Sequence, residues 1–258
     1  MINMEKAIDE FLKYVDNFDL NEKPIKMKKD HSFRVMDISN RIAVDLNLEK
    51  EKIELATLIG LLHDIARFEQ FKQFKTFSDL KSFDHGDYGV QLLEKDNMIR
   101  KYIDTDKYDN ILKKAIKNHN KFTIEDGLVE EEELFCKIVR DADKLDIFYE
   151  AATMFWENDI EKIENGRIRP EIKEQFIEGK LINKKDISMK DGAEKIIQVL
   201  AFIYDINFAT SFKIIYESKY IDIIIGKFNF KKQEAKEDFE EIRNISNNYI
   251  ENKLNLEK

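Results

Sequence analysis

Apolar residues recur every three or four positions along most of the chain, a pattern that predicts amphipathic helices. Residues 4–17 place Ile8, Phe11, Leu12 and Val15 on one helical face. A second helix is expected from Pro24 onward, because proline is favoured in the first turn of a helix. The stripe of that helix includes His31. The apolar face of a third helix, residues 55–62, leads directly into His63 and Asp64.

Helical periods return later in the chain, and two segments are less regular. The later periods are residues 85–93, 112–119, 130–150, 194–216 and 232–256. Residues 67–84 mix five phenylalanines with lysines and keep no clean period, so a loop folded against the core is expected. Asp84 is a candidate N-cap for the helix that follows. The β-branched run 220–225 is compatible with a strand, but its neighbours favour a helix.

Residues that interrupt helices are scarce. The 258 residues include 8 glycines and 2 prolines, and 43% of them are hydrophobic. Long helices with short turns follow, and a β-sandwich or barrel is disfavoured. We therefore predict an all-α fold with a sizeable core, forming one domain over residues 1–258.

Charge and apolar run length limit the partners. The net charge is −9, which disfavours duplex nucleic acid, because phosphate backbones bind basic surfaces. The single cysteine, Cys136, cannot form an intramolecular disulfide. Residues 1–6 lack the order of a secretory signal, and the apolar runs 55–62 and 196–204 are too short to span a bilayer. A cytoplasmic protein without a membrane partner is expected, and its oligomeric state is left open.

All four histidines lie at a helix end or on an apolar stripe. Taken singly, such a histidine is more often a hydrogen-bonded core residue. Two acidic residues share the same register, however, so six candidate ligands result: His31, His63, Asp64, His85, His119 and Asp143. Imidazole and carboxylate suit Mn, Fe, Co, Ni or Zn. Six ligands suffice for two divalent transition metal ions that share Asp64 as a bridge.

The spacing of these residues resembles the HD-domain superfamily of metal-dependent phosphohydrolases. The matching elements are His31, the pair His63-Asp64, and Asp143 within Ala142-Asp143-Lys144-Leu145. Asp143 is preferred to Asp141 because it follows the alanine and precedes Lys-Leu. His85 and His119 resemble the additional histidines of the binuclear branch. The resemblance covers an HD core of residues 25–150, in a helical bundle, and leaves 151–258 as a helical C-terminal extension.

The stretch HDIARFEQF…TFSDLKSFDHGDYG resembles a bacterial group of HD proteins whose substrates are largely unassigned. Guanosine tetraphosphate hydrolases of the superfamily carry Glu-Asp where this chain has Arg67-Phe68. Phosphodiesterases of the HD-GYP type need a Gly-Tyr-Pro segment, which this chain lacks. Arg67 occupies the place of a lysine in the HD-GYP group, which implies a cation that binds phosphate.

The resemblance implies hydrolysis of a phosphomonoester or phosphodiester, such as a nucleotide, by a metal-bound hydroxide. His31, His63 and Asp143 would hold one ion, and His85 and His119 the other. Arg67 and Lys144 are candidates to balance developing charge. For Arg67 the alternative is a salt bridge to Glu69 or to another surface acid.

Other candidates also carry alternatives. Lys144 could instead be a solvated helix residue. Asp146 could orient a ligand or be a plain exposed acid. Four phenylalanines could line a base-sized pocket or belong to the core: Phe68, Phe71, Phe74 and Phe77.

Three readings compete with hydrolysis. Some proteins resembling the HD fold hold two irons with the same ligand set and activate oxygen. A non-catalytic nucleotide-binding or regulatory module is a second alternative. A helical scaffold without a site is the weakest.

Overall fold

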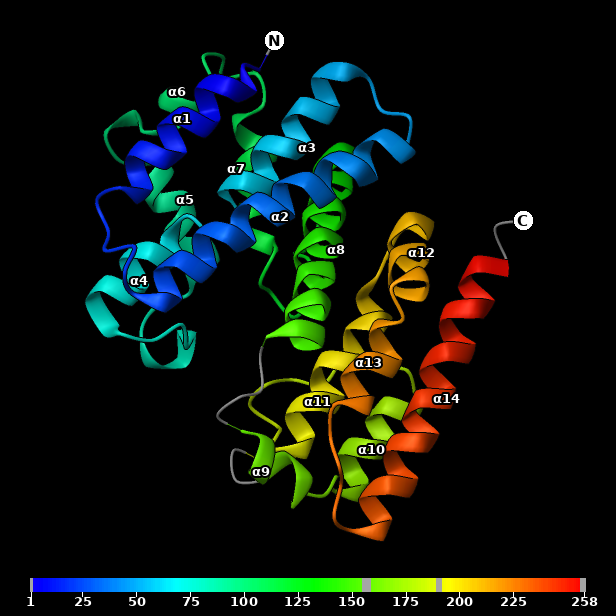
Figure 1. The fold of residues 1–258 in the computed structure, drawn as a ribbon. Coiled ribbons are helices and arrows are strands. Elements are labelled where there is room, and N and C mark those ends of the chain that lie inside the picture. The colour runs from blue at the N-terminus through cyan, green and yellow to red at the C-terminus, as the bar shows by residue number, and fades with distance from the viewer. Residues whose placement is uncertain (1, 155–158, 189–191, 256–258) are drawn as a thin grey trace. The chain divides into compact units, whose positions relative to one another are not determined.

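The computed structural model describes residues 2–154, 159–188 and 192–255. Within those ranges the chain is all-α, with helices, loops and no strand (Figure 1). The predicted fold class is therefore confirmed. The chain divides into two compact units, Met1–Asp143 and Lys144–Lys258, and each is described by itself. A single domain over the whole chain stays a prediction.

The first unit contains most of the predicted N-terminal helices. Its helices are α1 (Met4–Val15), α2 (Lys23–Asp45), α3 (Lys50–Leu62), α4 (Ala66–Phe74), α5 (His85–Glu94), α6 (Ile99–Tyr102) and α7 (Asp109–Asn118), with short 3-10 turns at Asp79–Lys81 and Lys95–Asn97. Helix α8 (Glu130–Thr153) begins in this unit. Asp84 caps α5 as predicted, since its side chain accepts a hydrogen bond from the backbone of Asp87.

Helices α2 and α3 lie side by side (Figure 1) and approach closely at Gly60. A Cβ atom at this position would lie 2.6 Å from Ser39 Oγ and 2.8 Å from the backbone oxygen of Val35. Only a residue without a side chain fits that spacing. The close approach lets His31 on α2 reach His63, which directly follows α3.

Helix α5 approaches the end of α7 in a similar way. A Cβ atom on Gly86 would lie 2.8 Å from the backbone oxygen of Lys117 and 2.5 Å from Asn120 Oδ1. The absence of a side chain at Gly86 therefore brings the start of α5 against the end of α7. His85 and His119 flank this contact.

The expected loop at residues 67–84 is wrong for its first half, because residues 66–74 form α4. Phe68 is fully buried and makes an edge contact with Phe11, with ring centroids 5.9 Å apart. The sequence shows no clean apolar period here because a polar residue of the same helix, Gln70, is also fully buried. Residues 75–84 are irregular apart from the turn Asp79–Lys81, as expected.

The second unit is helical, as predicted for the C-terminal extension. It contains α9 (Ile160–Glu164), α10 (Pro170–Ile177), α11 (Ala193–Leu200), the 3-10 turn Ala201–Asp205, α12 (Ala209–Glu217), α13 (Tyr220–Gly226) and α14 (Gln233–Asn255). Helix α13 confirms the preference for helix at 220–225. The predicted period 194–216 is divided between α11, the turn and α12, and residue 256 of the predicted closing helix lies outside the described residues.

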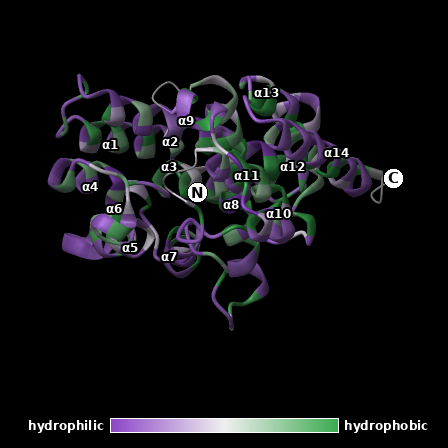
Figure 2. Ribbon diagram, turned by 90° about the horizontal axis from the view of Figure 1, so that it is seen from below, coloured by the Kyte–Doolittle hydropathy of each residue, from purple (hydrophilic) through white to green (hydrophobic). Residues whose placement is uncertain are grey.

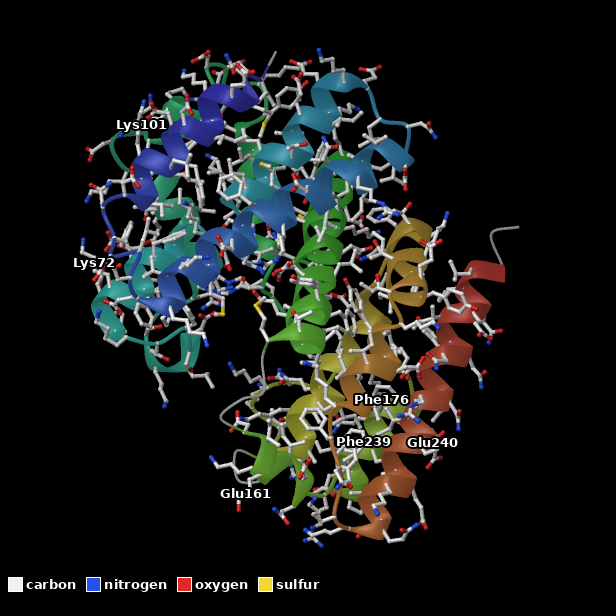
Figure 3. The ribbon with its side chains drawn as sticks, in the orientation of Figure 1. Lys72, Lys101, Glu161, Phe176, Phe239 and Glu240 are labelled. Carbon is white, nitrogen blue, oxygen red and sulfur yellow. The ribbon has the colours of Figure 1, made fainter. Side chains whose placement is uncertain are left out.

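Burial follows the amphipathic pattern in both units. Hydrophobic and hydrophilic residues alternate around the helices (Figure 2). Phe176 and Phe239 lie among the helices of the second unit, whereas Glu161 and Glu240 are on its surface (Figure 3). In the first unit, Figure 3 shows an exposed lysine, Lys72, at the periphery. Of the helices in the described ranges, none combines the length and the apolar character needed to cross a membrane.

Candidate metal centre

The six predicted ligands come from five segments of the first unit and lie together. His31 is on α2, His63 and Asp64 follow α3, and His85 begins α5. His119 follows α7, and Asp143 is on α8. Five of the six are buried, and the Asp143 side chain is 17% exposed. Two groups in this unit have ligand atoms within 4.8 Å of one another: His31, His63 and Asp64, and then Asp64, His85 and His119.

The first group surrounds Asp64 Oδ2. This oxygen lies 3.4 Å from His31 Nε2 and 3.6 Å from His63 Nε2. The two histidine Nε2 atoms are 3.1 Å apart. Asp143 Oδ1 closes the group, at 3.2 Å from His31 Nε2 and 3.7 Å from His63 Nε2.

The second group surrounds the other oxygen of the same carboxylate. Asp64 Oδ1 lies 3.4 Å from His85 Nε2 and 3.5 Å from His119 Nε2. The two Nε2 atoms are 3.0 Å apart. Asp64 Oδ1 is buried and accepts no hydrogen bond. One carboxylate therefore presents a separate oxygen to each histidine pair.

Backbone carbonyls determine which nitrogen of two histidines carries the proton. His63 Nδ1 lies 2.7 Å from the oxygen of Gly60, and His119 Nδ1 lies 2.7 Å from the oxygen of Ile116. A carbonyl only accepts, so each Nδ1 donates, and in the neutral imidazole Nε2 then carries a lone pair. The last turns of α3 and α7 supply these carbonyls because they have no partner within the helix.

Burial favours the neutral imidazole. It lowers the pKa of His63, although Asp64 and Asp143 oppose this effect. Burial, together with the charge of Arg67, lowers the pKa of His85 to about 4, against the opposing effect of Asp79. Neutral imidazole is the form that binds metals. At neutral pH both side chains are therefore in the form that a metal ion requires.

Positive charge compensates the buried carboxylate of Asp64. Burial alone would raise its pKa, but the positive charges of Lys28 and Arg67 outweigh that effect and hold the pKa well below its ordinary value. Lys28 Nζ lies 2.7 Å from Asp64 Oδ2, and Arg67 Nε lies 3.4 Å from Oδ1. The pKa of Asp143 is likewise well below its ordinary value, because its interactions with the imidazoles, first with that of His31, outweigh its burial. Both carboxylates are therefore ionised.

The donor set fits divalent metal ions. Around Asp64 Oδ1, the Nε2 atoms of two imidazoles and a carboxylate oxygen converge with acceptor atoms facing one another. Such a group is repulsive when buried unless a cation lies among the acceptors. Imidazole and carboxylate together suit transition metals.

Comparison with known families agrees with this geometry. A family model described as HD domain matches residues 29–147. This match supports membership of the HD-domain superfamily. That superfamily comprises metal-dependent phosphohydrolases, whose domains bind divalent metals. All six candidate ligands lie within the match. Searches of curated proteins and of solved structures find no match.

Arg67 of this HD domain lies beside the cluster and has other partners as well. Its NH1 donates to Asp79 Oδ1 at 2.8 Å, to Gln70 Oε1 at 2.6 Å and to the oxygen of Phe77 at 2.7 Å. The acids that pair with it are thus Asp79 and Asp64 rather than Glu69. Its role toward a phosphate stays a prediction.

Lys144 and Asp146 are not the solvent-exposed residues that their non-functional alternatives predicted. Lys144 Nζ forms an ion pair of 2.6 Å with Asp205, and the lysine side chain is 8% exposed. Asp146 is fully buried. The exposed readings of both residues are therefore wrong, whereas their functional roles stay predictions.

The four phenylalanines separate into different environments. Phe68 belongs to the aromatic core, and Phe71 contacts Phe77, with centroids 5.2 Å apart. Phe74 is exposed. Phe77 lies near the cluster, because Lys28 Nζ is 5.7 Å and Arg67 Cζ is 5.8 Å from its ring centroid. Of the four, Phe77 is the one that contacts cations next to Asp64.

Several residues that position the cluster were missed. Lys28 precedes His31 by almost one turn of α2, and this spacing is the signal that could have indicated that Lys28 lies beside the cluster. Asp79 accepts from His85 Nδ1 at 2.6 Å. Arg140 of α8 is buried and donates to the oxygens of Asn118 and Lys121, which fixes the backbone around His119. No local pattern marks either residue, because Asp79 lies in an irregular segment and the partners of Arg140 are 22 and 19 residues away.

Proposed function

We propose that this HD-domain protein hydrolyses a small phosphorylated substrate, such as a nucleotide, at a phosphomonoester or phosphodiester bond. The proposed cofactors are two divalent ions from the group Mn, Fe, Co, Ni and Zn. The proposed ligands are the six clustered residues, with Asp64 shared between the two positions.

One observation carries the proposal. The two oxygens of Asp64 face different histidine pairs, at 3.4 to 3.6 Å. A single-ion site would need one group of ligands around one point, with an open position for substrate. Two groups joined by a carboxylate instead favour two neighbouring ions, an arrangement that suits displacement at phosphorus.

The chain's own residues orient the reaction. When bound, the ions would supply Lewis-acid activation of water and of a phosphoryl oxygen. Backbone carbonyls hold His63 and His119 each in one ring orientation, so the lone pair of each Nε2 is already directed at its own oxygen of Asp64 before an ion arrives. Arg67 would release Asp79 or share its guanidinium to contact the substrate phosphate.

The first test measures metal content and phosphate release. Purified protein, before and after incubation with Mn²⁺, is analysed for transition metals and assayed against phosphomonoesters, phosphodiesters and nucleotides. About two ions per chain and release of phosphate are expected. Less than one ion per chain after incubation would refute the proposal. Oxygen consumption without hydrolysis would favour the di-iron alternative.

A substitution of the bridge makes the test specific. Asp64→Asn should abolish both metal binding and turnover, because an amide cannot bridge two cations as a carboxylate does. The matched control is Asp37→Asn on the exposed side of α2, which should leave both unchanged. An active, metal-loaded Asp64→Asn protein would refute the bridging role.

A further inference from the structure

In three histidines of the cluster, His63, His85 and His119, Nδ1 contacts a protein oxygen. Two of these oxygens are backbone carbonyls and the third belongs to a side chain. His63 and His119 end α3 and α7, and each uses a backbone carbonyl from the turn before it. His85 is the first residue of α5. The first turn of a helix offers unpaired N–H groups rather than unpaired carbonyls. A histidine in that place needs an acceptor from elsewhere to fix its Nδ1 proton.

Asp79 supplies that acceptor. Its Oδ2 lies 2.6 Å from His85 Nδ1. Its other oxygen, Oδ1, forms an ion pair with Arg67 NH1 at 2.8 Å, so the Asp79 side chain is an ionised carboxylate. An ionised carboxylate only accepts, so His85 Nδ1 donates and its Nε2 is left with a lone pair. That lone pair faces Asp64 Oδ1 and His119 Nε2.

The carboxylate of Asp79 is itself held by donors on both oxygens. Gln70 Nε2 donates to Oδ1 at 2.9 Å, beside the guanidinium of Arg67 at 2.8 Å. Asn120 Nδ2 lies 3.3 Å from Oδ2. Gln70 is fully buried and also donates to Ser82 Oγ and to the oxygen of Phe83. The irregular segment 75–84 is thus fixed where it meets the cluster.

We propose that Asp79 is a positioning residue for the metal position formed by His85, His119 and Asp64 Oδ1. It fixes the ring and tautomer of His85 and strengthens this imidazole as a ligand, and it holds Arg67 next to the same position. The position formed by His31, His63 and Asp143 does not depend on it. This inference rests on the proposed binuclear site. It adds that only one of the two metal positions depends on Asp79.

Asp79→Asn is the discriminating variant. All four side-chain partners of Asp79 are donors, so either orientation of the new amide directs its NH2 group at another donor. In a Mn²⁺ or Co²⁺ titration, wild type should bind two ions and the variant one ion at the original affinity. The second ion should bind about 10- to 100-fold more weakly, the usual effect of losing such a partner.

The matched control and the rescue use the same chemistry. Asp87→Asn removes a carboxylate from α5, the helix that begins at His85, where it pairs with Lys121, and should leave both affinities unchanged. Asp79→Glu restores a carboxylate and should recover part of the second affinity. Circular dichroism and the midpoint of thermal unfolding establish that each variant is folded.

A spectroscopic readout does not require metal. In metal-free protein at neutral pH, the His85 Nδ1 proton should give a downfield proton resonance, because it is shared with a carboxylate. The resonance should disappear in Asp79→Asn and persist in Asp87→Asn.

The outcomes separate the two proposals. A wild-type protein without metal refutes the binuclear function, and the resonance still decides whether Asp79 fixes His85. If folded Asp79→Asn binds two ions with wild-type affinities, the positioning role is wrong. If it loses both ions equally, the assignment to one half of the site is wrong.

Discussion

At the scale of single residues, Lys28 places a positive charge beside the carboxylate that a bound metal ion would also contact. Its ammonium lies 2.7 Å from Asp64 Oδ2, the oxygen that also faces His31 and His63. A metal ion among these ligands would take over the same task of compensating the carboxylate. Lys28 therefore matters most when metal is absent.

Lys28→Met should destabilise metal-free protein more than metal-loaded protein. In EDTA the loss should be about 3 kcal/mol, the low end for breaking a buried ion pair, because the Lys28 side chain is 15% exposed. Urea unfolding in EDTA and in excess Mn²⁺ measures the two free energies of unfolding.

The control for this substitution lies one half-turn earlier on α2. Lys26 pairs with Asp30 on the surface, so Lys26→Met should cost less than about 1 kcal/mol in either condition. If Lys28→Met lowers the free energy of unfolding equally with and without metal, Lys28 does not replace the metal ion as the counter-charge of Asp64.

Residues that form the cluster could be predicted, whereas those that support it could not. A histidine on an apolar stripe is visible in the sequence, and four of them with His63-Asp64 in one chain indicated a shared site. The partners of Asp64 and His85 carry no such mark. Lys28 is 36 residues from Asp64, and Asp79 lies in an irregular segment. Their roles arise from tertiary contacts between charged groups that are individually common on surfaces.

At the scale of elements, the spacing of α2 and α3 depends on Gly60. Gly60→Ala should lower the free energy of unfolding by about 1–3 kcal/mol, because its Cβ would overlap the backbone of Val35 and force the helices apart. Metal affinity should fall as well, since His31 and His63 separate. Urea unfolding and metal titration measure the two effects.

Gly226→Ala is the matched control for Gly60→Ala. Gly226 ends α13, and a Cβ there would meet no atom within 4 Å. The substitution should be neutral or slightly stabilising, because alanine loses less backbone entropy than glycine on folding. A neutral Gly60→Ala variant would mean that the two helices tolerate a wider spacing.

Glu194 connects elements of the second unit and makes its stability sensitive to acid. It is fully buried, pairs with Arg169 at 2.7 Å and accepts from the backbone of Arg169 and Ser188. Burial raises its pKa, but these bonds outweigh burial and lower it. Its contribution is present above the unfolded-state pKa, about 4.5, and is lost as pH falls further.

Glu194→Gln should therefore make stability less dependent on pH below about 4.5, because glutamine takes up no proton. Urea unfolding at pH 7 and at lower pH, in variant and wild type, gives the difference between the two slopes. An identical slope in both proteins would contradict a depressed pKa for Glu194. The surface variant Glu161→Gln serves as the control.

Long elements were predictable because one periodicity runs through them. The stripes of α1, α2 and α8 extend over several turns, so a single polar exception does not hide them. Helix α4 has only 9 residues, and the half-buried Arg67 and the buried Gln70 interrupt its apolar pattern. Both polar side chains form hydrogen bonds with segment 77–83, and those bonds are visible only in three dimensions.

At the scale of the whole molecule, metal binding should stabilise the folded chain by mass action. At a free ion concentration of 100 times Kd, each ion adds about 2.7 kcal/mol. For a chain of this size, each kcal/mol raises Tm by roughly 2–4 °C. Thermal unfolding in EDTA and in Mn²⁺ should differ by at least several degrees.

The same experiment tests the domain prediction. A single domain gives one transition that Mn²⁺ shifts as a whole. Two independently unfolding units would give two transitions, and the ion would shift the one that belongs to residues 1–143. Asp64→Asn is the control, and a Mn²⁺ shift of equal size in that variant would place the stabilising ion outside the cluster.

Gly60 affects both the spacing of the helices and the orientation of a ligand. Its missing side chain leaves room for α2, and its carbonyl accepts a hydrogen bond from His63 Nδ1. Any replacement that enters this space also moves the carbonyl, so the spacing between His31 and His63 and the orientation of the His63 ring change together. A side chain at position 60 would therefore fit without strain only if Ser39 and the facing turn of α2 moved as well.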